Sequence, residues 1–587
     1  MPKKYSTPDV YDKEIDLSEI TLPVGTNRAG IVICAPRGRA NHVTLVTSDK
    51  DFIENFGTPV LSGDNPIYGY GSYAALEFLQ ESDALYVVRA TDPSEDFYAK
   101  SGISSSCSSY SLPAIGASAG PVSDKLDEIY AIDNAVISAA PLLISSVCPG
   151  DWGNDIAVVI ETLTSASSWF YNYDDMPIGV DPQNIQTSAM PIANQVFKIN
   201  VYKKESTESW ESYTISKNGT SALSISPVET FLGTLTSMND SNNQQLFIKD
   251  IVNGKSNLIY LDVNVNATTL SQSSFPYSVT SAGEVIGVKN ESLIRLSGGS
   301  QTARSGIGTY FTAWEYFKDD AQYELDLLLL PDYTQTVQQA VNQYVVSQRK
   351  DCFLVTQVGT VNDVTVSQVI AAEKYGHMEP SYSGAYAGWC KYYDKYNAKN
   401  IYLPLSIMSG RIIARNDNVG SVFTAPSGMS RGVIPISNMN KVWSNAEIGQ
   451  LYDKNINTAR LINGTGFVIW GNKTLQTKAS ALDRINVRRT MIYIRKSIKK
   501  SMLQYVLDVN NNAKTRLRIW SNLDSFMSQV LAEGGLTAYK IICDESNNPP
   551  QIIDANILNV SIYVQPAKTV EFIEISYILT RTGVTIA

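Results

Sequence analysis

Hydrophobic residues near the start of the chain occur in short runs separated by an amphipathic stretch. The runs AGIVICA at 29–35 and ALYVVRA at 84–90 have the length and content of buried strands, and YAALEFL at 73–79 has helical spacing. The same rhythm returns after LSGGS at 296–300. There the pattern predicts helices near 305–318, 334–347 and 363–375, and strands at 326–330 and 352–356. Apolar strands alternating with helices are typical of a parallel sheet covered on both faces.

The middle of the chain has a different pattern. Eight of the twenty residues at 101–120 are Ser, and from 156 to about 265 strand-like segments such as IAVVIE and QVFKINVYKK are separated by turn residues. We expect no helix between these strands. The segment therefore predicts a β-rich domain inserted into the α/β part.

The C-terminal region begins with an amphipathic pattern near 483–507, with Asp483 as a plausible N-cap. Its apolar stripe recurs at steps of three and four, through Val487, Met491, Ile494, Ile498 and Met502. A second helix is predicted near 520–532, before Gly534 and Gly535. Two strands, 538–544 and 558–566, and a final extended segment follow. This order predicts an α+β domain.

Composition excludes several classes of protein. Of the 587 residues, 44% are hydrophobic and 18% are charged, as in folded globular domains. The N-terminus lacks the apolar core of a signal peptide, and the longest apolar run is too short to span a bilayer, so we expect a cytoplasmic protein without stable membrane association. Six scattered Cys and two His show no metal-ligand spacing, and the GxG fragments lack a complete phosphate-binding loop. The sequence therefore predicts no enzyme, no cofactor, no metal site and no catalytic residue.

Charge is unevenly distributed along the chain. Residues 101–200 contain two basic and ten acidic residues, whereas 484–518 contain ten basic residues and one acid, Asp508. The basic region is open to three interpretations: a solvated helix face, a nucleic-acid contact, or a face that meets an acidic protein. Nucleic acid is disfavoured because the chain is acidic overall and lacks a base-stacking module.

Several motifs resemble the tail sheath proteins of myovirus-type, T-even-like bacteriophages. The N-terminal matches include STPDVY at 6–11, GIVICAPRGRANHVTLVTS at 30–48 and PGDWGN at 149–154. The C-terminal matches include YDKYN at 393–397, ARNDNV at 414–419, SGMSRG at 427–432, DRINVRR at 483–489, CDESNNPP at 543–550 and YVQPAKTVEFIEI at 563–575. Their shared order along the chain makes the resemblance specific, and it leaves 93–148 and most of 163–296 unmatched.

The resemblance implies a multidomain protein of α/β and α+β class with extended arms at both ends. The expected parts are an N-terminal arm at 1–22 that joins the C-terminal domain, an α/β sheath domain at 23–92 and 297–480, an inserted outer β-rich domain at 93–296, and a tube-facing domain with a C-terminal arm at 481–587. Residues expected to face the tube are the basic ones of the first C-terminal helix: Arg484, Arg488, Arg489, Arg495, Lys496, Lys499 and Lys500.

The implied function is structural. Such a chain polymerises helically with itself around a tail tube, meets baseplate and tail terminator proteins, and contracts to drive the tube through the host envelope. It would assemble in the bacterial cytoplasm and reside in the virion. Alternatives are a tailocin or another contractile injection system, or a host-surface-binding module carried on the insert. The arms would link neighbouring subunits through alternating apolar positions, Val10, Ile15 and Leu17 at one end and Ile575, Tyr577 and Leu579 at the other, unless they fold back on their own subunit.

Overall fold

The chain forms two units in the computed structural model. The structure describes residues 27–92, 94–103, 109–116, 124–128, 142–162, 197–217, 220–223, 225–233, 247–264, 277–279, 285–288, 293–301, 307–331, 334–372 and 379–576. Unit 1 consists of 1–30, 318–392 and 402–587, and unit 2 consists of 31–317 and 393–401. The boundaries predicted from the sequence divide the chain more finely than this, and they stay predictions.

Unit 2 contains a small α/β part. Strand β2 (Val43–Val46) pairs antiparallel with β5 (Leu85–Arg89), which lies beside β1 (Ala29–Ile33). A β-carbon on Gly71, the first residue of α2, would lie 2.8 Å from the Ile33 side chain, so this close helix–strand approach needs a glycine. The predicted strands and helix at 29–90 are confirmed. The other elements of this part are α1 (Asp49–Phe56), α2 (Gly71–Leu79), α6 (Ile307–Glu315), β3 (Leu61–Ser62) and β4 (Asn65–Pro66).

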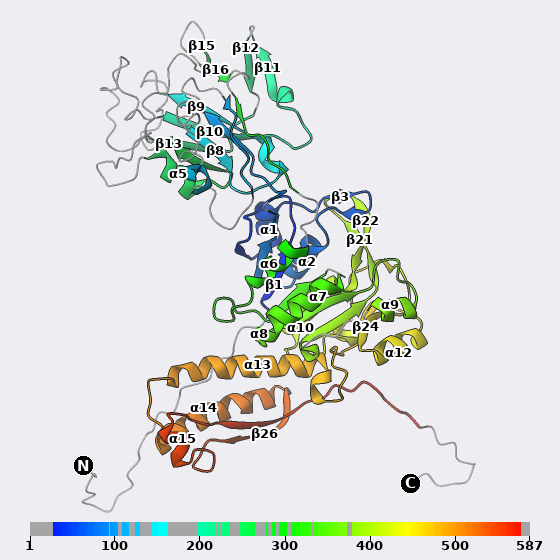
Figure 1. The fold of residues 1–587 in the computed structure, drawn as a ribbon. Helices are drawn as coiled ribbons and strands as arrows, with labels where there is room; N and C mark the ends of the chain where they lie inside the picture. The colour runs from blue at the N-terminus through cyan, green and yellow to red at the C-terminus, as the bar shows by residue number, and fades with distance from the viewer. Residues whose placement is uncertain are drawn as a thin grey trace, which may run out of the picture. The chain divides into compact units, whose positions relative to one another are not determined.

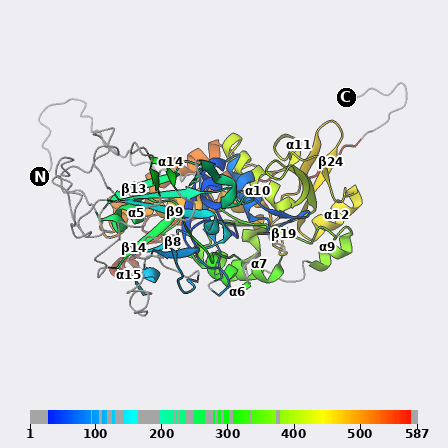
Figure 2. The same ribbon diagram turned by 90° about the horizontal axis from the view of Figure 1, so that it is seen from above.

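The β-rich part of unit 2 contains two four-stranded sheets, with orders β13-β10-β9-β17 and β14-β8-β6-β7. Their buried aliphatic side chains, among them Ile144, Val158 and Ile259, form one core. Figure 1 labels β8, β9, β10 and β13 of these sheets, and Figure 2 shows the same region from above. The strands are β6 (Lys100–Ile103), β7 (Ser109–Tyr110), β8 (Leu142–Ser146), β9 (Ile156–Thr162), β10 (Phe197–Lys203), β11 (Thr214–Lys217), β12 (Thr220–Leu223), β13 (Glu229–Gly233), β14 (Ile259–Val263), β15 (Tyr277–Val279), β16 (Val285–Val288) and β17 (Ile294–Arg295).

One expectation for this region is wrong, because a helix does occur among the strands. Helix α5 (Ile248–Lys255) contacts β13 and β14. Its buried residues, Ile248 and Val252, are four positions apart and therefore share one helical face, which packs into the core. Eight residues with only two buried positions are too short a pattern to stand out in the sequence.

The chain enters and leaves the β-rich part at one place. Phe97 pairs antiparallel with Ser300, and Lys100 pairs with Ser297. Asn154 reinforces this crossing, because its side-chain amide donates to the Gly299 carbonyl and its side-chain oxygen accepts from the Gly299 amide. Adjacent entry and exit strands are the geometry that an inserted domain requires.

Unit 1 is built on a sheet that includes the order β18-β19-β20-β24-β25. The pairs β18–β19, β19–β20 and β20–β24 are parallel, and β25 returns antiparallel to β24. Every residue of β18, β19 and β20 is buried, which confirms the parallel sheet predicted from its apolar runs. The strands are β18 (Leu327–Leu330), β19 (Phe353–Val358), β20 (Ser383–Ala387), β24 (Ile456–Ile462) and β25 (Gly466–Trp470).

Helices lie against this sheet. The predicted helix near 334–347 is interrupted, because a π-helical turn at Asn342–Val346 separates two α-helical stretches. Asn342 is buried there, and its amide donates to the Ser383 hydroxyl at 2.8 Å. Helix α12 begins with a complete capping box made by Ser444 and Glu447. The helices are α7 (Gln335–Val341), α8 (Ser347–Arg349), α9 (Val366–Ala372), α10 (Leu405–Val419), α11 (Gly428–Arg431) and α12 (Asn445–Asp453), and a smaller sheet combines β21 (Trp389–Asp394), β22 (Lys399–Pro404) and β23 (Asn438–Met439).

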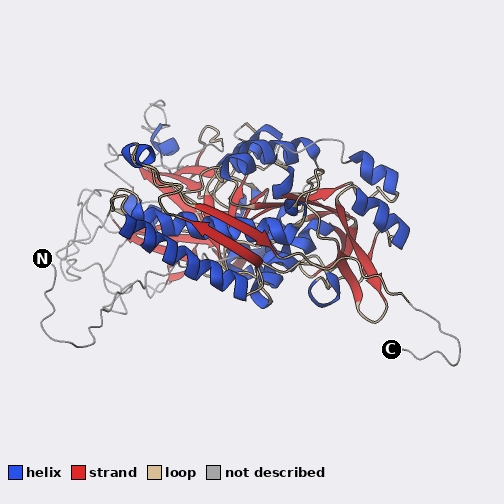
Figure 3. Cartoon of the chain, turned by 90° about the horizontal axis from the view of Figure 1, so that it is seen from below, coloured by secondary structure: helices blue, strands red, loops and turns tan. Residues whose placement is uncertain are grey.

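The last part of unit 1 is a layer that we call the C-terminal layer, residues 481–576. It contains two long helices, one short helix and two paired strands, shown in Figures 1 and 3. The expected N-cap Asp483 is wrong: Asp483 ends a short 3₁₀ turn, and the helix is preceded by Arg484 with no side-chain cap. The elements are α13 (Ile485–Met502), α14 (Ala513–Ala532), α15 (Pro550–Asp554), β26 (Leu536–Ile542) and β27 (Ser561–Pro566).

Candidate functional site: the C-terminal layer

Strands β26 and β27 form an antiparallel ribbon of two strands, with register from Leu536↔Pro566 to Ile542↔Ser561. No third strand pairs with either of them within the described residues, so each strand keeps one edge of backbone N–H and C=O groups without a strand partner. An isolated two-stranded ribbon is marginal in water and needs support from a hydrophobic face. Open strand edges are also the sites where other chains add strands.

That support comes from the two long helices. Leu536 and Ile541 of β26 pack with Leu523 and Phe526 of α14 and with Ile494 of α13 in one buried cluster. Burying a Leu, Ile or Phe side chain stabilises a fold by roughly 1.5–3 kcal/mol, so this cluster anchors the ribbon. The strand edges remain open while one face of the ribbon is held in place.

Several basic residues of α13 are directed into unit 1, whereas their sequence pattern suggested an outward-facing basic surface. Arg489 is buried and forms a bidentate ion pair with Asp417, with Nη1 to Oδ1 at 2.8 Å. Burial alone would lower the pKa of Arg489, but Asp417 raises it above its ordinary value, so the guanidinium stays charged. Lys496 donates to the Asp326 carboxylate at 2.7 Å and to the Leu325 carbonyl at 2.8 Å.

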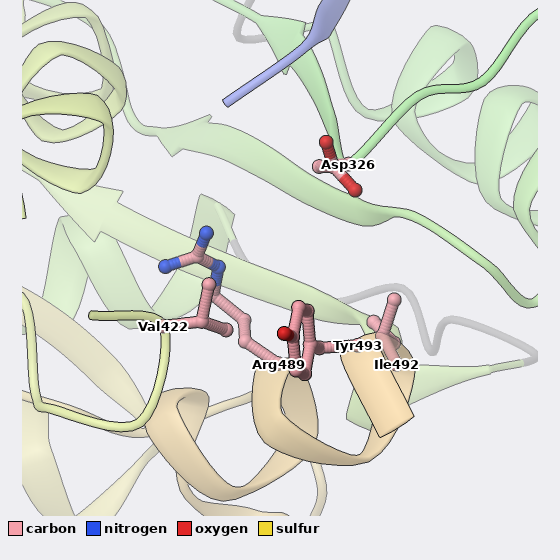
Figure 4. Close-up of a pocket in the computed structure, with 5 residues that line it drawn as sticks. All are labelled: Asp326, Val422, Arg489, Ile492 and Tyr493. Atoms are coloured by element: carbon pink, nitrogen blue, oxygen red, sulfur yellow. The ribbon is translucent and has the colours of Figure 1, made fainter. Parts of the chain in front are cut away.

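Figure 4 shows the region where α13 faces the sheet of unit 1. The Arg489 side chain extends from α13 toward the sheet, and Asp326 stands apart from it, just before β18. Val422, Ile492 and Tyr493 complete the lining of a cavity of about 10 Å³. That volume suffices for about one water molecule, so this is a packed, charged contact and not a ligand site.

Two further basic residues of α13 both contact Tyr382. The Arg488 guanidinium lies 4.0 Å from the centre of the Tyr382 ring and also donates to the Ser381 hydroxyl. Arg495 donates to the Tyr382 hydroxyl at 2.7 Å. Burial lowers the pKa of Arg488, which has aromatic and hydroxyl partners instead of a carboxylate ion pair.

The two outermost lysines form exposed ion pairs. Lys499 pairs with Asp320, and Lys500 pairs with Glu324 at 2.9 Å. The lysine side chains are 68% and 60% exposed, so these pairs are screened by solvent and contribute little to stability.

Arg484 contacts the segment that follows the ribbon. Its Nε donates to Oε1 of Glu571 at 2.5 Å, and its Nη2 donates to Oε2 at 2.9 Å. Arg484 also pairs with the adjacent Asp483 at 3.1 Å. The other acids that meet the seven basic residues come from 320–326, Asp417 and Glu571, all distant in sequence. Each of the seven basic residues has a partner in unit 1, and a contact with a tube stays a prediction.

The arm residues are described only in part. Ile575 is 65% exposed, and Val570, Phe572 and Ile573 of the same segment are more exposed still. Val10, Ile15, Leu17, Tyr577 and Leu579 lie outside the described residues.

Sequence reasoning missed two features of unit 1. The first is a groove of about 800 Å³ whose walls include Ile448, Tyr452 and Trp470 of the body and residues 567–573. The second is the loop after α13, where Leu507 is fully exposed and has a φ of +69°, a left-handed conformation unusual for a leucine. The groove combines residues from separate segments of the chain, and the Leu507 loop depends on a backbone conformation. Neither can be recognised from the periodicity of the sequence.

The described part of the chain holds no candidate metal-binding cluster, membrane-spanning helix or disulfide. No cluster of three or more His, Cys, Asp or Glu residues there could hold a metal ion. No described helix is long and apolar enough to cross a bilayer. Five cysteines, Cys34, Cys148, Cys352, Cys390 and Cys543, are buried and form no disulfide.

Sequence comparison identifies relatives of this layer and of other parts of the chain. Residues 477–580 match the family model described as Phage tail sheath C-terminal domain. The tail sheath protein of Enterobacteria phage T4 is 31% identical over 313 residues, which are 50% of this chain and 47% of that protein. The tail sheath protein of Vibrio phage KVP40 is 36% identical over 191 residues, which are 32% of this chain and 28% of that protein. The matches thus span less than half of the length of these relatives.

Structure comparison extends the likeness in fold. The sheath tail protein from Listeria innocua superposes with a TM-score of 0.53 over 94% of each chain, at 11% identity. The mixed α/β multidomain fold is therefore confirmed at this level, and the resemblance to tail sheath proteins is confirmed by the named relatives. Those names describe a structural component and not an enzyme, in agreement with the prediction from the sequence.

Proposed function

We propose that this chain is a structural subunit of a contractile phage tail sheath, which polymerises helically around a tail tube and shortens to drive the tube through the host envelope. The observation that carries the proposal is the β26–β27 ribbon, which has two open edges and a buried supporting face within the segment matched to a tail sheath domain. The polymer would reside in the virion, with baseplate and tail terminator proteins at its ends and assembly in the host cytoplasm.

The ribbon supports linkage by strand addition. Each open edge offers a row of backbone hydrogen-bonding groups, and an arm from a neighbouring copy can pair with it while its alternate side chains set the register. The exposed apolar residues of 570–575 suit such an arm, because they are not buried within their own subunit. Head-to-tail contacts of this kind do not close on themselves, so they generate a helical polymer.

The ion pairs of α13 support rigid-body motion during contraction. The buried Arg489–Asp417 pair joins the C-terminal layer to α10, and the Lys496–Asp326 pair joins it to the residue before β18. Breaking a buried pair is costly, so unit 1 would rotate as one body while contacts between copies rearrange. The free energy would come from interfaces that are better satisfied in the shorter polymer, without nucleotide hydrolysis.

The exposed lysines in the last turn of α13 support a contact between this end of the helix and the tube. Lys499 and Lys500 are more than half exposed and have solvent-screened partners. Exposed charges of this kind exchange partners readily, which suits a contact that must form during assembly and release during contraction. The five basic residues nearer the start of α13 would act mainly by holding the helix in place.

The experiment that tests the proposal is electron microscopy of the purified full-length protein and of two truncated forms. The full chain should form tubular polymers. Deleting residues 1–22 or 577–587 should give folded protein that no longer polymerises, with little change in melting temperature, because the arms would pair with other copies. Tubes of normal length from both truncated forms would refute the linking arms, and a lowered melting temperature would show that the arms fold back on their own subunit.

A further inference from the structure

The segment that follows the ribbon has one covered side chain among exposed neighbours. Residues 568–570 and 572–576 are exposed, with Phe572 at 82% and Ile573 at 80%. Glu571 is the exception, since its side chain is only 16% exposed. A charged residue is thus the covered one, while its apolar neighbours face solvent. This inverts the usual rule of burial.

The ion pair between Arg484 and Glu571 fixes the orientation of the Glu571 carboxylate. Arg484 donates to both carboxylate oxygens, at 2.5 and 2.9 Å, and a two-point contact between planar groups fixes orientation as well as distance. Tyr452 also meets Glu571, and its pKa is raised by burial and by this carboxylate. Arg484 lies directly before α13 and makes no side-chain cap, and its third guanidinium nitrogen, Nη1, pairs with the neighbouring Asp483 at 3.1 Å. The anchor is therefore tied to the start of a long helix.

Fixing one residue of an extended segment fixes the faces of the residues that follow. Side chains alternate along a strand, so a slip of one residue exchanges the two faces. The segment is not part of a strand in the free chain. Once it is paired as a strand, Ile573 and Ile575 fall on the face of Glu571, and Phe572, Glu574 and Ser576 fall on the other. Ile575 is also the first of the alternating arm positions Ile575, Tyr577 and Leu579.

We infer that the Arg484–Glu571 pair is a positioning clamp that sets the register in which the C-terminal arm of one copy pairs with a second copy of this chain. The inference rests on the proposed function, because it needs arms that link copies. Because the segment is held at residue 571 and its neighbours are exposed, the arm beyond that residue would keep its register while its direction follows a moving neighbour.

Spin labels in the polymer test the clamp. Single cysteines at 575 and 576 would carry the label in a chain with Cys107→Ser, since the other five cysteines are buried. In the wild-type polymer we expect the label at 575 to be immobilised and the label at 576 to stay mobile. Glu571→Gln and Arg484→Lys should each abolish this difference, the second because lysine keeps the charge but loses the two-point contact. The exchange Glu571→Arg with Arg484→Glu should restore it.

Glu574→Gln is the matched control, because Glu574 lies in the same segment but is exposed. It should leave the difference between 575 and 576 intact. An unchanged difference in the Glu571→Gln polymer would overturn the clamp while leaving the linking arms in place. A wild-type label at 575 that is as mobile in the polymer as in the monomer would instead refute the linking arms, and the clamp with them. Unchanged melting temperatures would confirm that the variants fold.

Discussion

Unit 1 and unit 2 each contain a carboxylate buried beside a cation, and the two sites differ in how the charge is matched. In unit 1, Asp417 has a fully buried side chain and faces both terminal nitrogens of Arg489. In unit 2, Asp262 of β14 is 1% exposed, and its lysine, Lys249 of α5, is shared with Asp127. One cation serves one acid in the first site and two acids in the second.

The difference has electrostatic consequences. Burial raises the pKa of Asp417 above its ordinary value, and the two-point contact with Arg489, whose own pKa is raised by this partner, opposes that shift. At the second site burial raises the pKa of Asp262 to about 6, and Asp127 adds to this effect. The Asp262 Oδ2 atom is buried without a hydrogen-bond partner in the described structure. The first site matches one cation with one acid through a two-point contact, whereas the second shares one lysine between two acids and holds an acid that titrates near pH 6.

The largest expected effect is the loss of the matched pair. Arg489→Met would leave Asp417 buried without a counter-charge and should destabilise unit 1 by about 3–5 kcal/mol. Urea denaturation of the monomeric protein, followed by hydrogen exchange in β18 and α13, would measure it. The double variant Arg489→Met with Asp417→Leu should recover most of the loss. A loss below about 1 kcal/mol in the single variant would contradict a buried, matched pair.

The second effect is a pH dependence confined to the β-rich part of unit 2. The pKa of Asp262 rises from an ordinary value near 3.8 to about 6, so the folded state binds more protons between these values. Its contribution to stability is therefore present below pH ~4 and is lost as the pH rises through about 6, a change on the order of 2–3 kcal/mol. Asp127 acts outside this window, because its pKa is lowered.

The Asp262→Asn variant isolates the contribution of Asp262 to this pH dependence. Hydrogen exchange of the β14 amides between pH 4 and pH 7 should show falling protection in the wild type and a flatter profile in the variant. Unit 1 amides serve as the internal reference, since Asp262 is not part of that unit. The same slope in both proteins would show that another group titrates in this range.

The smallest effect is expected at the exposed end of α13. Lys500→Ala removes an ion pair whose lysine is 60% exposed, and it should change the unfolding free energy by less than about 1 kcal/mol. The loss should shrink further in high salt, because solvent ions screen the pair. If Lys500→Ala destabilised unit 1 as much as Arg489→Met, burial would not be what separates strong from weak pairs in this helix.

Hydrophobic spacing in the sequence was sufficient for much of the fold. The apolar runs predicted the parallel strands β18 and β19, and the stripe from Val487 to Met502 predicted α13. The two strands of the ribbon, β26 and β27, also lie where they were expected. Such predictions succeed because periodicity along the chain is a local property that burial on one face imposes.

The contacts of the C-terminal layer were harder to predict from the sequence. The sequence showed ten basic residues at 484–518 but not that five of the seven expected to face the tube meet acids from remote segments, because ion pairing depends on distance in space. It also gave no reason to distinguish Glu571 from Glu574, although one is gripped by Arg484 and the other is exposed. Helix α5 was missed because two buried residues are too few to establish a period.

By itself, then, the sequence determined the order and type of the main elements, the acidic and basic segments, and the motifs shared with tail sheath proteins. The tertiary structure decided which charges are used internally, which strand edges stay open, and which single residue of the C-terminal segment is held. The physical reason is that local periodicity follows from neighbours in the chain, whereas burial, ion pairing and strand pairing depend on residues brought together across hundreds of positions.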